Sequence, residues 1–265
     1  KIIFEITPAS NAETGFAELY INDRLAKGFR PIAYDHISSQ LWFPDAKMKL
    51  VSLDLSIPPK KIGYLTGAGD KVGDALLNLG YELDFLDPEK LDEATLLSYD
   101  VILTGVRFFN VNERASQLTP KLLRFVEQGG NLIVQYNTSY RLKTKSFFPY
   151  PLKISRDRVT QEDAPVTFLQ PDHVVLNKPN KMIKSDFDDW VQERGLYFPD
   201  GWSKEYQAIL SWSDTGEQPK KGGLLIAPYG RGNYVYTGIS FFRELPAGVS
   251  GAYKLLVNLI SLSHE

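Results

Sequence analysis

The sequence contains no cysteine among its 265 residues. Disulfide bonds, thiolate metal sites and cysteine nucleophiles are therefore all excluded from this chain. Histidine is nearly as scarce, because only His36, His173 and His264 occur, far apart and without a His-x-x-x-His pair. Zinc sites need several ligands gathered at close spacing, so the sequence predicts no metal site and no cofactor.

An excess of charge and long apolar runs are missing as well. The 30 Lys and Arg residues against 32 Asp and Glu residues give a formal net charge of -2, which predicts no nucleic-acid partner. No run approaches the roughly 20 apolar residues that span a bilayer, so we expect no membrane insertion. Residues 1–5 lack the apolar core of a signal peptide, and the missing initial Met suggests a processed piece.

The first part of the chain has strand signals without helical periodicity. Residues 17–21 lead into a turn at Asn22-Asp23, and residues 51–57 alternate apolar and polar side chains. The run Pro58-Pro59-Lys60-Lys61 breaks this pattern. We therefore predict a β-rich arm over residues 1–58 and a second domain over residues 59–265.

Strand and helix signals alternate from residue 59 onward. A helix is predicted over residues 72–79, and another starts at Thr119 as its cap, with Pro120 at its first position. Strands are predicted between and beside them at residues 62–65, 81–86, 101–106 and 132–135. Strands joined by helices in this way imply an α/β fold with an open, doubly wound parallel sheet.

The last third of the chain is less regular. Residues 147–151 form an aromatic loop, and residues 184–194 have the pattern of a short helix. Residues 224–227 and 234–237 flank a glycine-containing turn and predict a hairpin. A closing helix is expected over residues 252–262.

Polar side chains follow several of the predicted strands. Ligands of open parallel sheets bind beyond the carboxyl ends of the strands, so these side chains are candidates for a ligand pocket. Solvated turns with capping side chains are an equal alternative. The candidate pocket, extended by two residues from later in the chain, comprises Asp70, Arg107, Asn110, Gln135, Tyr136, Asn137, Glu193 and Arg194.

The fourth predicted strand ends where several hydrolase-like folds hold their nucleophile. Tyr136, Asn137 and Thr138 occupy this place, and Ser139 is not part of a Gly-x-Ser-x-Gly elbow. His173 has the chemistry to activate a nucleophile, but its position beside Pro and Asp favours a turn residue. The sequence therefore predicts no catalytic residue.

Two further patterns have functional and structural interpretations. Three glycines between residues 67 and 73, with Asp87 beyond, resemble a dinucleotide fingerprint, but their spacing differs from G-x-G-x-x-G. Asp70 would also place a carboxylate where a pyrophosphate binds, so we favour a capped turn. The acidic residues around Trp190 suit a sugar, but an amphipathic helix with Phe187, Trp190 and Val191 inward is favoured.

Residues 61–262 resemble the class I glutamine amidotransferase-like domain found C-terminal in bacterial PIG-L/LmbE-type deacetylase proteins. The preceding segment, residues 34–37, resembles the region before that domain. The matching pieces of the domain are residues 63–64 with 67–70, Gly105-Val106-Arg107 with Asn110, and residues 129–130, 135–137, 190–197 and 238–243.

The resemblance implies a flavodoxin-like sheet and a parent polypeptide with a zinc-dependent N-acetyl-sugar deacetylase domain. It also favours a periplasmic or other extracytoplasmic location. Amidotransferases need a nucleophilic Cys and a His-Glu pair, and the deacetylase needs a His-Pro-Asp-Asp motif; this chain has none of them. We therefore expect neither activity in the chain itself.

Three functional hypotheses follow. The first is a non-catalytic accessory module that binds a glycan or packs against the deacetylase domain of the same polypeptide. The second is an enzyme of another type, acting on a carbohydrate-like substrate through Asp70, Arg107, Asn137 or Glu193. The third is a structural or oligomerisation domain.

Overall fold

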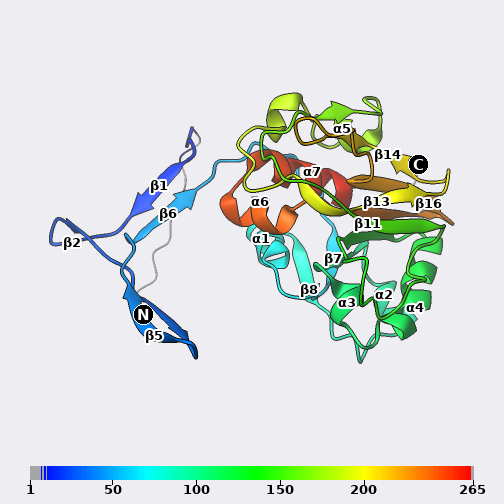
Figure 1. Ribbon diagram of the computed structural model, residues 1–265, viewed down its shortest axis with the longest axis horizontal. Coiled ribbons are helices and arrows are strands. Elements are labelled where there is room, and N and C mark those ends of the chain that lie inside the picture. The colour runs from blue at the N-terminus through cyan, green and yellow to red at the C-terminus, as the bar shows by residue number, and fades with distance from the viewer. Residues whose placement is uncertain (1–6, 8, 10, 264–265) are drawn as a thin grey trace. The chain divides into compact units, whose positions relative to one another are not determined.

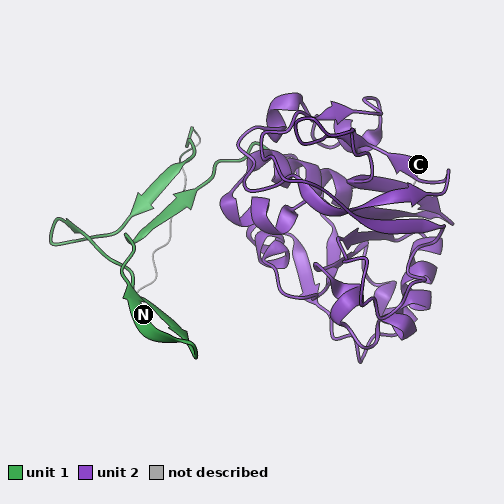
Figure 2. Cartoon of the chain, viewed as in Figure 1, with its two compact units in different colours: residues 1–54 green, residues 55–265 purple. Residues whose placement is uncertain are grey.

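The computed structural model describes residues 7, 9 and 11–263, and it divides into two compact units (Figure 2). The first unit is Lys1–Asp54 and the second is Leu55–Glu265. The boundary between the units lies four residues before the predicted boundary after Pro58.

The first unit, called the arm below, consists of three separate antiparallel strand pairs. The turn predicted at Asn22-Asp23 is confirmed, since both residues have left-handed backbone angles, with φ of 50° and 59°. The pairs are β1 (Gly15–Glu18) with β6 (Lys47–Leu50), β2 (Tyr20–Ile21) with β3 (Arg24–Leu25), and β4 (Arg30–Tyr34) with β5 (Ile37–Trp42).

The strand predicted over residues 51–57 is wrong, because this segment is extended without pairing to a neighbouring strand. Leu55 and Ile57 pack against the core of the second unit. Asn180 holds the backbone of Ser56 from both sides, accepting from its N–H at 2.8 Å and donating to its carbonyl at 3.0 Å. The alternation of apolar and polar residues over 51–57 thus reflects a segment that packs one face on the core of the second unit. The side chain of Asn180 bonds the backbone of Ser56, as a partner strand would have done.

The second unit, called the α/β unit below, is built on a seven-stranded mixed sheet (Figure 1). Two strands, β16 (Leu224–Tyr229) and β14 (Gln207–Ala208), extend one edge in antiparallel fashion. The other five are parallel, in the spatial order β8 (Glu82–Phe85), β7 (Lys61–Leu65), β9 (Val101–Thr104), β10 (Asn131–Gln135) and β17 (Gly232–Thr237). The four predicted strands and the hairpin are confirmed within a few residues at each end.

Helices cover both faces of the sheet, as the unbroken apolar strands require. Successive residues of β10 show this, because Ile133 packs into one core cluster while Leu132 and Val134 pack into the other. The first cluster includes residues of α1 (Val72–Asn78), α6 (Phe241–Ala247) and α7 (Ser250–Ile260). The second includes residues of α2 (Glu93–Leu96), α3 (Phe108–Val111) and α4 (Ala115–Glu127).

The predicted start of the helix before β10 is wrong. Helix α4 begins at Ala115, so Thr119 and Pro120 lie inside it. The hydroxyl of Thr119 donates to the carbonyl of Ala115 at 2.8 Å, instead of capping the helix. Burial of Ala115 and Leu118 in the core extends the helix past the local capping signal.

A long excursion between β10 and β16 carries the remaining elements. The expected helix over residues 184–194 is only the single 3₁₀ turn η1 (Lys184–Phe187), and α5 (Val174–Asn177) is equally short. The closing helix is confirmed as α7, starting two residues early. Within the described residues, no helix has the length and apolar content to cross a bilayer. The strand pairs of the excursion are β11 (Leu152–Val159) with β13 (Gly195–Trp202) and β12 (Thr167–Phe168) with β15 (Leu210–Ser211).

Candidate functional site

The strand order reverses between β7 and β9, and in such sheets this point usually opens into a ligand crevice. Here the two loops close on each other. A Cβ on Gly67 would lie 2.1 Å from the carbonyl oxygen of Val106, and the N–H of Ala68 donates to that oxygen at 2.8 Å. Glycine is required here because the two loop backbones approach so closely.

Asp70 joins the same two loops. Its carboxylate accepts from the hydroxyl of Tyr64 at 2.5 Å and from the N–H groups of Val72 and Val106, each at 3.0 Å. The bond to Val72 lies at the start of α1, but the N-cap residue of this helix is Lys71 and not Asp70 as predicted. Asp70 therefore links β7, the start of α1 and the loop after β9 by hydrogen bonds.

The buried side-chain amides of Asn137 and Asn110 link the segments that follow β9 and β10. The Asn137 Oδ1 atom accepts from the N–H of Phe109 at 2.9 Å, and its Nδ2 atom donates to the carbonyl of Gln135 at 3.0 Å. Asn110 accepts from the N–H of Thr138 at 2.9 Å and donates to the carbonyl of Tyr140 at 2.9 Å. Both amides bond backbone groups at the end of β10 and in the segments that follow β9 and β10, so they fix the shape of the strand ends.

Replacing Asn137 with alanine should lower the free energy of unfolding by about 2 kcal/mol, because it leaves the N–H of Phe109 buried without an acceptor. Urea denaturation followed by circular dichroism measures this change. Ser139→Ala, two residues away and partly exposed, is the matched control and should stay within about 0.5 kcal/mol. Equal stability of the two variants would contradict the structural role of Asn137.

The fourth strand end lacks the geometry of a nucleophile elbow. In the described structure, a left-handed residue followed directly by a helix occurs at Arg107, with φ 60° and ψ 23° before α3. Tyr136 instead continues into an irregular loop, and its carbonyl accepts from the N–H of Arg107 at 2.8 Å. The elbow-like turn therefore follows β9 and carries an arginine, and the expectation that placed it after β10 was wrong.

Tyr136 is held among other rings. It stacks on Tyr197 with ring centroids 5.9 Å apart and planes within 9°, and Phe242 lies 5.4 Å away. Burial raises the pKa of Tyr136, while the positive charges of Arg107 and Arg243 oppose this change. The phenol therefore stays protonated at neutral pH.

Glu193 lies near Tyr136 and is already paired. Its two carboxylate oxygens accept from Arg158 at 2.8 Å and from Arg243 at 3.0 Å, and the residue is buried. Asp70 accepts from the N–H of Val106, next to Arg107, whose own N–H donates to Tyr136. Glu193 pairs with Arg243, the neighbour of the Phe242 ring that lies beside Tyr136. These four predicted residues thus lie near the carboxyl ends of the parallel strands.

The side chains of Arg194 and Gln135 donate hydrogen bonds to backbone carbonyl groups. The guanidinium of Arg194 donates to the carbonyl of Ala164 from Nε at 3.1 Å and from Nη2 at 2.7 Å, and to that of Phe187 at 2.5 Å. Gln135 donates to the carbonyl of Thr104 at 3.2 Å, while its Oε1 atom is buried without a partner. Both side chains are buried.

The acidic stretch before Arg194 has structural partners. Asp186 accepts from the N–H of Ile183 at 2.7 Å and forms an ion pair with Lys254 at 2.7 Å. Phe187 and Trp190 are buried and stacked 5.3 Å apart, as the favoured interpretation predicted, although the helix itself is wrong. Phe187 ends η1 and Trp190 lies in the irregular segment after it, so both rings are buried without the predicted helix.

His173, the described histidine of the α/β unit, has a structural role. His173 caps α5, because its Nδ1 atom accepts from the N–H of Val175 at 3.2 Å, and burial lowers its pKa. This agrees with the predicted turn residue. His36 belongs to the arm, and His264 lies outside the described residues. Among the described residues there is no group of three or more His, Asp or Glu side chains that could hold a metal ion.

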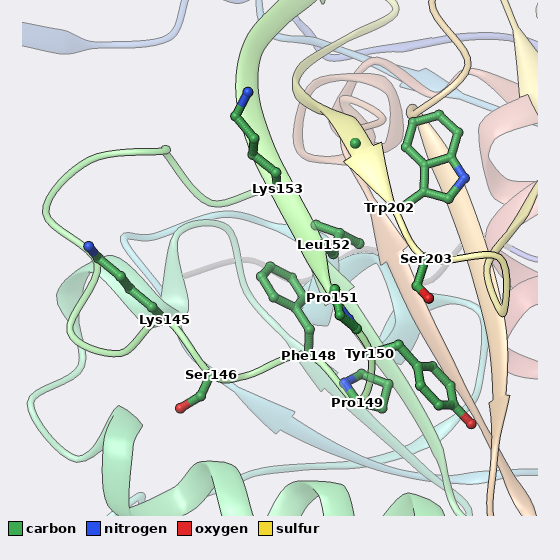
Figure 3. A pocket seen from close by; sticks show the side chains of 11 residues that line it. Lys145, Ser146, Phe148, Pro149, Tyr150, Pro151, Leu152, Lys153, Trp202 and Ser203 are labelled. Carbon is green, nitrogen blue, oxygen red and sulfur yellow. The ribbon is translucent and has the colours of Figure 1, made fainter.

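A cavity of about 690 Å³ lies elsewhere on the α/β unit, and sequence reasoning missed it (Figure 3). The aromatic loop at residues 147–151 was its only visible signal, since its other wall comes from about 50 residues further along the chain. The lining residues are Lys145, Ser146, Phe148, Pro149, Tyr150, Pro151, Leu152, Lys153, Gly201, Trp202 and Ser203.

Comparison with known proteins gives structural similarity without a sequence family. No protein-family model matches the chain, and no curated protein matches it in sequence. A GMP synthase component of Thermoplasma acidophilum is similar at 8% identity and a TM-score of 0.49, over 77% of this chain and 96% of that one. PurLQS of Thermotoga maritima is similar at 15% identity and a TM-score of 0.45, over 76% of this chain and 97% of that one.

A β-galactosidase of Rahnella sp. R3 is similar at 14% identity and a TM-score of 0.45, over 76% of this chain but only 31% of that one. Glutamine amidotransferase-like folds are thus among the structural neighbours. The α/β fold itself stands on the mixed sheet and its two helical layers.

Proposed function

We propose that this chain is a non-catalytic accessory module, with a class I glutamine amidotransferase-like α/β unit and an arm that packs against another protein domain. The parallel strands support the flavodoxin-like part of this proposal. Numbered along the chain, β7, β8, β9, β10 and β17 lie in the spatial order 2-1-3-4-5, which is the flavodoxin-like order.

The state of the strand ends supports a module without catalysis. Asp70 and Asn137 use their polar atoms on backbone groups, and Glu193 is neutralised by two arginines. An enzyme needs such groups to be available to a substrate. The same residues thus favour a scaffold over the alternative of a carbohydrate-active enzyme.

The exposed apolar surface of the arm is the observation that supports the packing role. None of its described residues is buried, and isolated two-stranded sheets are marginally stable in water. Eleven large apolar side chains of the arm are exposed, a density that marks an interaction surface. They are Phe16, Leu19, Tyr20, Ile21, Phe29, Tyr34, Ile37, Leu41, Trp42, Phe43 and Met48.

The occupant we propose for this apolar surface is the deacetylase domain of the same polypeptide, as the PIG-L/LmbE resemblance implies. Such a parent acts on N-acetyl sugars, which makes a glycan the proposed ligand of the module and an extracytoplasmic compartment its proposed location. The arm would then bury its aromatic side chains against the partner domain and gain the core that its strand pairs lack.

Capture of the separately expressed deacetylase domain by the full chain tests the proposal. We expect the wild-type chain to retain the domain, and the double variant Trp42→Ser with Phe43→Ser to bind it at least tenfold more weakly. Ile183→Ser removes a similarly exposed apolar side chain from the α/β unit, where it is half exposed, and should not change capture. Absence of capture by the wild-type chain would reject the deacetylase as the partner.

Light scattering on the same samples separates the third hypothesis. A dimer of the wild-type chain that dissociates in the arm variant would show that a second copy covers the arm, and the module would then be an oligomerisation domain. A monomer that captures the deacetylase domain supports the accessory role.

A further inference from the structure

The cavity of about 690 Å³ between the loop before β11 and the end of β13 has the size of a small-molecule site. It contains none of the eight residues predicted from the sequence. Figure 3 shows its walls: Phe148, Tyr150 and Leu152 on one segment, and Trp202 and Ser203 on the other. The two segments are joined by the pairing of Leu152 with Trp202 and by a hydrogen bond from the Ser203 N–H to the Pro151 carbonyl at 2.9 Å.

The Phe148 wall is anchored in the core of the α/β unit. The preceding residue, Phe147, is buried and stacks on Phe109 with centroids 4.0 Å apart and planes within 11°. Phe148 itself contacts Phe147 at 4.0 Å and Tyr236 of the sheet at 6.0 Å. The loop therefore presents its ring in a fixed position, and a ligand would not have to order it.

The Tyr150 wall is anchored equally well. Its hydroxyl donates to the carbonyl of Pro228 at 3.1 Å, and its ring meets Tyr206 and Tyr229 edge-on at 6.1 and 5.7 Å. The hydroxyl of Tyr206 donates to the carbonyl of Tyr150 at 3.2 Å. Since these bonds fix the ring, what Tyr150 offers to a ligand is its apolar surface.

Two lysines supply positive charge to the cavity. Lys153 pairs with Asp200 at 3.0 Å, but its side chain is still 76% exposed, so its ammonium group keeps donors for a ligand. Lys145 is exposed and has no ion pair within the described residues. Both side chains project away from Leu152 in Figure 3. Asp200 balances one of the two charges, which leaves the site with one unpaired cation.

We propose that this cavity binds an acidic saccharide, a pyranose ring that carries a carboxylate, and this proposal rests on the glycan ligand of the proposed function. The rings of Phe148, Tyr150 and Trp202 match the apolar C–H face of a pyranose. The unpaired ammonium of Lys145 and the exposed ammonium of Lys153 each supply a cation for the carboxylate from a different segment of the lining. Ser203 donates to Glu205, so its oxygen is left to accept from a sugar hydroxyl.

A nucleotide phosphate fits the same cavity less well. Phosphate sites in proteins commonly add clustered backbone N–H groups or the planar fork of arginine to any lysine they contain. This cavity has two flexible lysines and two prolines, Pro149 and Pro151, which have no N–H to donate. A single carboxylate on a ring is the anion that its charge and shape suit best.

Isothermal titration with a glucuronate-containing tetrasaccharide and with its carboxyl-reduced counterpart tests the proposal. We expect the acidic probe to bind at least tenfold more tightly than the reduced probe. Lys145→Gln and Lys153→Gln should each weaken binding of the acidic probe three- to tenfold without changing the reduced one. Lys184→Gln, an exposed lysine of η1 outside the cavity, is the matched control and should leave both affinities unchanged.

Chemical-shift changes of the Trp202 indole N–H on titration locate the site independently of the variants. Equal affinity for the two probes, or no shift at Trp202, would overturn the acidic-saccharide proposal. The arm variant with Trp42 and Phe43 replaced should bind the acidic probe like the wild type. If the wild-type chain captures the deacetylase domain but does not bind the saccharide, this inference alone is rejected. If it binds the saccharide but does not capture the domain, only the packing role is rejected.

Discussion

Replacing Gly251 with alanine should destabilise the α/β unit by about 3 kcal/mol, because overpacking against rigid backbone forces whole elements apart. Gly251 lies in the first turn of α7, where a Cβ would be 1.6 Å from the carbonyl oxygen of Asp186 and 2.8 Å from its Cα. Backbone atoms of η1 cannot rotate away as a side chain can. Helix α7 would have to shift, and with it the ion pair between Lys254 and Asp186.

Urea denaturation of the variant measures this loss as a lower midpoint at an unchanged slope. Ser250→Ala is the matched control, since it makes a change of similar size at the neighbouring exposed position of the same helix and should stay within about 0.5 kcal/mol. A Gly251→Ala variant as stable as the control would mean that α7 and η1 are not in backbone contact. A variant that fails to accumulate as folded protein would agree with the expected direction.

The sheet was predictable because its strands carry their own signal. Residues 101–104 and 132–134 are apolar at nearly every position, which is typical of a strand covered on both faces. The helix start at Thr119-Pro120 was equally clear as a local signal but was wrong, because burial of Ala115 and Leu118 decided the outcome. Local propensity is worth a few tenths of a kcal/mol per residue, and burial of one apolar side chain is worth more.

The candidate site was predictable in place and only partly in content. The loops that carry Asp70, Arg107 and Tyr136 are bonded to one another, because the carboxyl ends of parallel strands meet at the same end of a sheet. What the sequence cannot show is how polar atoms are shared between loops. The close contact of Gly67 with Val106 and the bonds of Asn137 depend on three-dimensional packing.

The cavity at Trp202 illustrates the same limit. Its two walls come from segments about 50 residues apart, and neither has a recognised motif. Their proximity follows from the pairing of β11 with β13, which contains register shifts between Lys153 and Arg158. Such bulges change which face a side chain takes, so alternation along the sequence does not predict the lining residues.

Glu244 should make the stability of the α/β unit depend on pH. Its side chain is fully buried in α6, where it accepts from the N–H of Val191 at 3.0 Å and from the hydroxyl of Ser240 at 3.3 Å. Burial raises the pKa of Glu244 from 4.5 to about 7, although Arg194 nearby opposes this change. The folded protein therefore keeps a proton that the unfolded chain releases at lower pH.

The sign of the effect follows from proton binding. Below pH 4.5 both states are protonated, and above pH 7 both are ionised, so the stability should fall between these values as pH rises. A shift of this size corresponds to a loss of about 3 kcal/mol. Glu244→Gln keeps an acceptor for Val191 without the charge, so the variant should be more stable than the wild type at pH 8 and equal to it at pH 4.

Denaturation curves of both proteins at pH values from 4 to 8 measure this difference. Glu127→Gln is the control, because Glu127 is exposed on α4 and its replacement should leave the pH profile of the wild type unchanged. Parallel profiles for wild type and Glu244→Gln would show that the buried carboxyl titrates at its ordinary pKa. A profile that flattens only in Glu244→Gln would identify Glu244 as the group that lowers stability towards neutral pH, next to the segment that holds Glu193 at the sheet edge.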